Sequence, residues 1–119
     1  NLNKQQVTQR IGPVVDILRT ARPQTPILLV EDRTYSNSFL VTSRRNRNAG
    51  NRQALKQAFT KMTARGVRGL HYLDGTRLLG SDGEDTVDGS HPTDLGFQRH
   101  AAAFQTALAP LLSGQQSPE

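Results

Sequence analysis

The sequence predicts an α/β fold, in which helices flank a parallel sheet in three layers. The prediction rests on two short segments, the apolar 27–30 and 68–73 with its Leu70 and Tyr72, that alternate with longer segments of helical periodicity. The first segment is apolar at every position, which is typical of a strand buried on both faces of a parallel sheet. Strands that alternate with helices favour parallel pairing with right-handed crossovers. Because two strands alone are marginally stable in water, we expect the sheet in this chain to be incomplete.

The composition fits one domain or part of one. The chain has 119 residues, of which 34% are hydrophobic and 5% aromatic, and this is lean for an independent core. Its apolar residues are gathered into segments, unlike those of a disordered chain. The absence of cysteine excludes disulfides and thiolate metal sites, and it leaves the compartment open, with a secreted or periplasmic location among the possibilities. No apolar run approaches the roughly 20 residues of a membrane span.

The net charge of +5 has two interpretations. It can indicate affinity for nucleic acid or another polyanion, or it can be the solvated basic surface of a protein whose acidic part lies elsewhere. The arginines are spread along the chain, and only Arg44, Arg45 and Arg47 cluster. We therefore favour the solvated surface and expect no nucleic-acid partner. A non-catalytic basic binding module that contacts polyanions through these three arginines stays open as the alternative.

The first helix is expected to begin after Asn3, which has the spacing of a capping box with Gln6. One helical face follows, with apolar residues at steps of four and three: Val7, Ile11, Val14, Leu18 and Ala21. Proline in a helix interior costs about 3 kcal/mol. At Pro13 we therefore expect a kink, or a short first turn followed by the main helix, and Pro23 ends the helix.

Polar residues follow the first strand, at the carboxyl edge where open α/β sheets bind ligands. Glu31, Asp32 and Arg33 are candidates for the rim of an active site, although we favour a local ion pair or helix cap. Residues 34–48 then form a long polar connection, a length typical of functional loops. This connection is either a lid or substrate-facing loop, or a surface segment anchored by Phe39 and Leu40.

The second helix is predicted over 48–65, with Leu55, Phe59 and Met62 on its apolar face and Gly66 as its C-terminal cap. The second strand follows at 68–73. Its His71 is interpreted as a structural residue rather than a ligand.

Residues 81–90 carry four acidic side chains, so a calcium site has to be considered. A calcium-binding EF-hand loop requires acidic residues at alternate positions followed by glycine, and here Thr86 and Val87 break that pattern. We therefore expect no metal site and no cofactor.

Asp88 precedes His91 by three residues in a turn-rich segment. A carboxylate at that distance can accept a hydrogen bond from one imidazole nitrogen and leave the other free to act as a base. Pro92 disfavours a helical conformation for His91, so the histidine belongs to a loop.

A last helix is predicted from Asp94, with Thr93 as its N-cap. Its apolar face comprises Phe97, Ala101, Phe104, Leu108 and Leu111. Pro110 is expected to kink the last turn, His100 lies at the surface or its boundary, and residues 113–119 form a flexible tail.

Three segments resemble the later part of the SGNH (GDSL-type) hydrolases, which cleave esters with a Ser-His-Asp triad. They are "DGSHPTDLGFQRHA" over 88–101, "RPQTPILLVEDRTY" from Arg22 and "RGVRGLHYLDGTRLLG" from Arg65. The resemblance implies that residues 1–112 are the C-terminal part of a three-layer SGNH-type hydrolase domain, of the flavodoxin-like kind. It also implies that His91 is the catalytic base and that Asp88 orients it.

The family's nucleophilic serine lies in a Gly-Asp-Ser-type motif near the start of the domain, and this sequence has none. Gly80, Ser81 and Asp82 are the residue types of that motif, but they stand in a different order and late in the sequence. Ser90 is adjacent to His91, which is too close for its hydroxyl to be activated for attack. Asn1 matches the family's oxyanion asparagine, although Asn3 competes as a simple helix cap. The resemblance therefore implies an inactive fragment whose partner is the missing N-terminal part of the domain.

The expected substrate of the complete domain is a small ester or an acylated carbohydrate, and the sequence leaves its identity open. A further possibility is a catalytically dead α/β fragment that is stable only when assembled with another chain.

Overall fold

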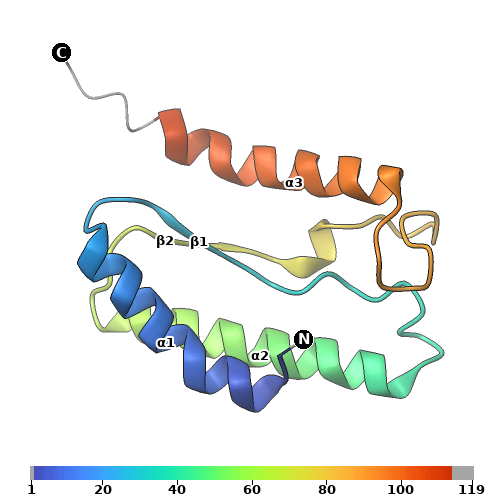
Figure 1. Ribbon diagram of the computed structural model, residues 1–119, viewed down its shortest axis with the longest axis horizontal. Helices are drawn as coiled ribbons and strands as arrows, with labels where there is room; N and C mark the ends of the chain where they lie inside the picture. Colours follow the sequence, from blue (N-terminus) through green and yellow to red (C-terminus); the bar gives the residue numbers. More distant parts are fainter. Residues whose placement is uncertain (1, 114–119) are drawn as a thin grey trace.

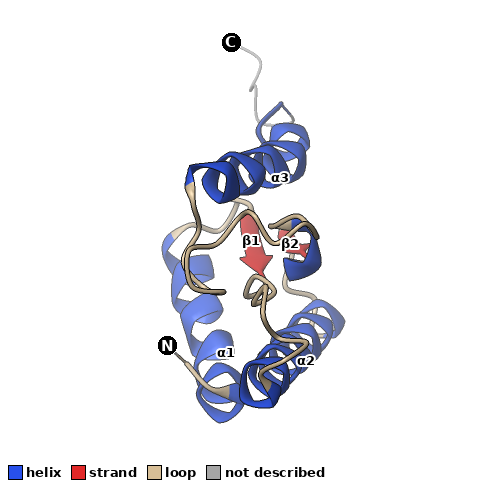
Figure 2. Ribbon diagram, turned by 90° about the vertical axis from the view of Figure 1, so that its right-hand side faces the viewer, coloured by secondary structure: helices blue, strands red, loops and turns tan. Residues whose placement is uncertain are grey.

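The computed structural model describes residues 2–113 and confirms the predicted α/β/α order. Its elements are α1 (Lys4–Ala21), β1 (Ile27–Val30), α2 (Thr42–Ala64), β2 (Leu70–Leu73) and α3 (Asp94–Ser113), with a 3-10 turn over Gly75–Arg77. The two strands pair in parallel, with Ile27 opposite Leu70 and Val30 opposite Leu73. Helices α1 and α2 cover one face of the sheet and α3 covers the other (Figures 1 and 2).

The hydrophobic core lies between the sheet and the α1–α2 pair. Four buried side chains form its centre: Val15, Leu29, Leu55 and Met62. Phe59 of α2 packs on Tyr72 of β2, with their ring centroids 5.1 Å apart. The predicted apolar face of α2 is therefore confirmed.

The apolar face predicted for α1 is only partly correct. Val7 and Ile11 pack against the core, but the buried residue beyond them is Val15, while Val14 and Leu18 are 47% and 46% exposed. Two apolar stripes run side by side on this helix, and the stripe spaced by four residues faces α2 and β1. A count of apolar spacing alone does not choose between them.

Helix α1 begins as predicted but does not break at its proline. The Asn3 carboxamide accepts from the Gln6 amide, and the Gln6 side chain accepts from the Asn3 amide, which completes the capping box. Pro13 lies inside one continuous helix, so a separate first turn is ruled out. The ring of Pro13 is exposed, while Ile11 and Val15 on either side of it pack against the core, and this packing holds the helix together.

Helix α2 begins at Thr42, six residues earlier than predicted, so the connection from β1 is 31–41 rather than 34–48. Its first turns are polar and its N-cap Val41 makes no side-chain cap bond. Tertiary contacts stabilise them instead, since the Asn48 carboxamide donates to the Arg33 carbonyl and accepts from the Tyr35 amide. At the other end Gly66 has a φ of +83°, the left-handed conformation expected of its capping position.

Helix α3 follows its predicted N-cap, because the Thr93 hydroxyl accepts from the Gly96 amide at 3.2 Å. Its predicted apolar face is wrong at the start, where Phe97 is 62% exposed. The helix continues through Pro110 to Ser113, the first residue of the predicted tail, and residues 114–119 lie outside the described part of the chain. Among residues 2–113, no helix is long and apolar enough to cross a membrane.

Candidate active site

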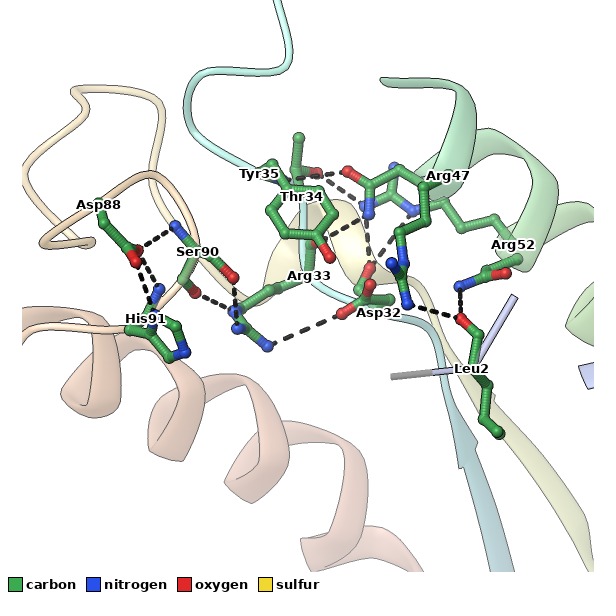
Figure 3. A network of polar contacts seen from close by, with 12 residues as sticks. Leu2, Asp32, Arg33, Thr34, Tyr35, Arg47, Arg52, Asp88, Ser90 and His91 are labelled. Carbon is green, nitrogen blue, oxygen red and sulfur yellow. Dashed lines mark hydrogen bonds and ion pairs between the residues drawn. The ribbon is translucent and has the colours of Figure 1, made fainter. Parts of the chain in front are cut away.

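Asp88 and His91 face each other at the carboxyl edge of the sheet. The Asp88 Oδ2 atom lies 2.8 Å from His91 Nδ1, and Asp88 Oδ1 accepts the backbone amides of Ser90 and His91 at 2.9 Å each (Figure 3). One carboxylate therefore fixes both the turn of the loop and the orientation of the imidazole ring.

The electrostatics of this pair keep the carboxylate ionised. Hydrogen bonds from the backbone amide and the ring of His91, and then from the Ser90 amide, hold the pKa of Asp88 well below its usual range. The His91 side chain is 75% exposed and that of Asp88 is 52% exposed. No described residue is hydrogen-bonded to His91 Nε2, so this nitrogen is open to a group from outside residues 2–113. An imidazole held in this way can take a proton at one nitrogen while the carboxylate stabilises the resulting charge.

The loop around the pair is a tight, internally bonded turn. The Val87 amide donates to the His91 carbonyl at 2.9 Å, and Thr86 bridges to Pro92. Gly89 has a φ of +83°, and a Cβ atom there would lie 2.5 Å from the Asn37 side chain. Only glycine combines that conformation with so close an approach.

The connection after β1 holds this loop from the other side. Arg33 Nε donates to the Ser90 carbonyl at 2.5 Å and its Nη2 to Ser90 Oγ at 3.1 Å. The Ser36 amide donates to the Gly89 carbonyl at 3.1 Å. From the first turn of α2, Arg44 Nη1 donates to the Asp88 carbonyl at 2.9 Å. The polar residues after β1 therefore position the histidine loop, as Figure 3 shows for Arg33 and Ser90.

Glu31 and Asp32, the other polar residues after β1, are held in ion pairs, the interpretation that the sequence favoured. Asp32 lies 3.7 Å from Arg33, and the buried Glu31 lies 3.4 Å from Arg52. Glu31 also accepts the Tyr72 hydroxyl at 2.6 Å. Burial, and then this bond, raise the pKa of Tyr72.

A second carboxylate cluster anchors the loop to α3, and sequence reasoning missed it. The fully buried Asp85 binds the Arg99 guanidinium and the Gly80 amide, and Asp82 binds Arg99 at 2.6 and 2.8 Å. Burial by itself would raise the pKa of Asp85, but the bonds from Arg99 and Gly80 outweigh it and leave the pKa lowered. No spacing rule joins residues 14 positions apart across a loop, so the sequence carried no signal for this pair.

The Asp88–His91 pair, which we call the dyad, opens into a recess of about 320 Å³, the histidine recess. It is lined by Tyr35, Ser43, Arg44, Arg47, Asp88, Ser90 and His91. A larger and mainly apolar cleft of about 500 Å³ lies between α1 and α2 at the end of β1, and His91 does not contribute to it. The chemistry of the dyad therefore belongs to the smaller, polar recess.

The remaining predicted residues are distributed as follows. Asn1 lies outside the described residues, and Asn3 is the helix cap. Arg44 and Arg47 belong to α2 and line the histidine recess, whereas Arg45 is exposed beside them. These contacts do not test the polyanion-binding alternative, which stays a prediction. Among residues 2–113, no three His, Asp or Glu side chains are grouped as a metal site would require.

Known proteins resemble this chain in sequence and in fold. The model of the GDSL-like lipase/acylhydrolase family matches residues 1–109. A crystal structure described as a GDSL-like lipase from Bacteroides ovatus superimposes with a TM-score of 0.89 at 27% identity, covering 95% of this chain and 34% of that one. The salicylyl-acyltransferase of a tetracycline biosynthetic pathway has a TM-score of 0.71 at 20% identity, with the same coverage, and supports the fold alone. A search of curated proteins found no match.

Because the family match spans nearly the whole sequence, the chain belongs to the GDSL-like lipase/acylhydrolase family. It spans about a third of the length of each of these two solved structures.

Proposed function

We propose that this member of the GDSL-like lipase/acylhydrolase family supplies the histidine and aspartate of a serine esterase or acylhydrolase. The observation that carries the proposal is the 2.8 Å contact between Asp88 Oδ2 and His91 Nδ1, with the ring exposed at the rim of a recess. The nucleophilic serine belongs to a segment upstream of Asn1. The substrate is a carboxylic ester, small or attached to a carbohydrate.

In the proposed mechanism His91 Nε2 takes the proton of the serine hydroxyl as the oxygen attacks the ester carbonyl. Asp88 holds Nδ1 protonated and stabilises the imidazolium that forms. The acyl carbon–oxygen bond then breaks, and His91 returns the proton to the leaving alcohol. Water then attacks the acyl carbonyl while His91 takes a proton from it. His91 gives that proton to the serine oxygen as the bond between the serine and the acyl group breaks.

Hydroxyls within the described residues are poor candidates for the nucleophile. Ser43 and Ser90 line the histidine recess, but neither is hydrogen-bonded to His91 Nε2. Ser90 Oγ instead accepts a bond from Arg33. The chain alone is therefore proposed to be inactive, since a base without its nucleophile has nothing to activate.

The test is ester hydrolysis by the complete protein, compared between wild type and His91→Ala. General acid–base catalysis contributes about 10²- to 10⁴-fold, so kcat should fall by that factor. Because His91 is exposed, its replacement should change the free energy of unfolding by less than about 0.5 kcal/mol.

Two control variants sharpen this test. His71→Ala removes a histidine that lies in β2, away from the recess, and should leave kcat near the wild-type value. Ser90→Ala should retain hydrolysis, because its hydroxyl is not the nucleophile. Full activity in His91→Ala would reject the proposed role, and complete loss in Ser90→Ala would move the nucleophile into this chain.

A further inference from the structure

Two arginines beside the dyad lack the acidic partners that neighbouring arginines have. Arg44 and Arg47 line the histidine recess, and no carboxylate among residues 2–113 lies within ion-pair distance of either. Arg33 and Arg52, at the same edge of the sheet, are paired with carboxylates. Both recess arginines are half-buried, and a cation withdrawn from water is usually compensated by an anion.

Arg44 is held in an orientation suited to a planar anion. Its Nη1 atom donates to Asn37 Oδ1 and to the Asp88 carbonyl, both at 2.9 Å. Its guanidinium lies over the ring of the buried Tyr35, 5.4 Å from the centroid. These contacts leave Nε and Nη2 without a partner among the described residues. A guanidinium fixed on an aromatic face loses little freedom when it binds a carboxylate through two bonds.

Arg47 adds a second positive group to the recess. Its Nη2 atom donates to the Leu2 carbonyl at 3.0 Å, which leaves Nε and Nη1 without a described partner (Figure 3). The opposing charge in the recess is Asp88, whose two oxygens already accept three hydrogen bonds. Two guanidinium groups therefore share the recess with one carboxylate, and the recess has a net positive charge.

We propose that the histidine recess binds an anionic group, a carboxylate in the first instance, on the alcohol half of the ester. This inference rests on the proposed function, because His91 must lie within hydrogen-bond distance of the leaving oxygen to return its proton. The recess that His91 lines then receives the rest of the alcohol. Hydrolysis yields a hydroxy acid from the alcohol half and a carboxylic acid from the acyl half. The preferred substrates are therefore acyl esters of hydroxy acids.

The experiment compares two esters that differ only in charge, para-acetoxybenzoate and its methyl ester, as substrates of the complete protein. We expect kcat/KM to favour the anion by about tenfold, since a hydrogen bond to a charged group contributes on that scale. Arg47→Gln should lower this ratio by a similar factor. Arg45→Gln removes the same charge from the exposed surface of the same helix and should keep the wild-type ratio. Added salt should lower the wild-type ratio, because it screens partly exposed charges.

The outcomes separate the recess from the proposed function. Hydrolysis of both esters at equal kcat/KM, or an unchanged ratio in Arg47→Gln, would overturn the anion site and leave the esterase proposal standing. A preference for mono-para-nitrophenyl adipate over para-nitrophenyl hexanoate, without a preference for para-acetoxybenzoate, would place the anion on the acyl half and overturn the assignment. If neither acetoxy ester is hydrolysed, calorimetric titration with para-hydroxybenzoate and with its neutral amide tests whether the recess binds the anion. Equal binding of the two compounds, or binding of neither, rejects the anion site.

Discussion

The two faces of the sheet are covered in different ways. On the α1–α2 face, the buried side chains of Val15, Leu29, Leu55 and Met62 form a continuous hydrophobic core. On the α3 face, the sheet and the helix border an open cleft of about 630 Å³, partly lined by the small side chains of α3. Gly96 is the buried residue of α3, while Phe97 and Leu112 are each 62% exposed.

Polar contacts replace apolar packing at the start of α3. Arg99 binds Asp82 and Asp85, the Thr93 amide donates to the Asp85 carbonyl at 2.9 Å, and Gly96 packs so closely on that carbonyl that a Cβ would lie 2.2 Å from its oxygen. These directional contacts fix the loop that carries His91. The packed α1–α2 face therefore supplies stability, while the polar α3 face sets the geometry of the site.

The largest expected effect on stability is on the packed face. Met62 is 2% exposed at the centre of the core, and Met62→Ala should lower the free energy of unfolding of the complete protein by about 2–5 kcal/mol through lost burial and a cavity. Leu112→Ala, on exposed α3, is the matched control and should change it by less than about 0.5 kcal/mol. Denaturant titration measures both. Equal losses in the two variants would remove the distinction between the faces.

A second large effect, on stability and on the histidine loop together, is expected from Arg99→Met. The substitution leaves the Asp85 carboxylate buried without its cation, which is strongly unfavourable. Hydrogen exchange of the amides in 80–100 should accelerate, and kcat of the complete protein should fall with it. Arg65→Met breaks an ion pair whose side chains are each 57% exposed and should leave both unchanged. Unaltered exchange in Arg99→Met would mean that the ion pairs of Arg99 do not hold the histidine loop.

Part of the α1–α2 face was predictable because local sequence patterns encode it, although apolar spacing chose the wrong stripe of α1. Residues 27–30 form a strand with the predicted bounds, and the Asn3–Gln6 capping box has its predicted bonds. The Asp88–His91 contact was also predictable, since a three-residue separation in a turn brings the side chains together. In each case the information lies within a few neighbouring residues.

The contacts of the polar face were not predictable, because they join distant parts of the chain. Arg33 meets Ser90 across 57 positions, and Arg99 selects Asp85 and Asp82 from the acidic loop that also contains Glu84. The early start of α2 depends on Asn48 bonding to the connection after β1. Asn1, the predicted oxyanion residue, stays a prediction.

The smallest expected effect concerns pH and the α3 face. His100 is half-buried on α3, its Nδ1 atom is buried without a partner among residues 2–113, and Arg33 and Asp85 are the charged groups that act on it. Burial, and then Arg33, lower the pKa of His100 below its usual value of 6.5. As the pH falls through 6.5, the unfolded chain therefore takes up a proton before the folded chain does.

The folded state should consequently lose stability as the pH falls below about 6.5, until the lowered pKa of His100 is reached. His100→Gln keeps a polar side chain but cannot titrate, so its free energy of unfolding should vary less with pH over this interval. Denaturant titrations of both proteins between about pH 5 and 7 measure the difference. Parallel pH profiles for the two proteins would show that the α3 face accommodates a protonated His100 without cost, and that its looser packing admits enough water to solvate the charge.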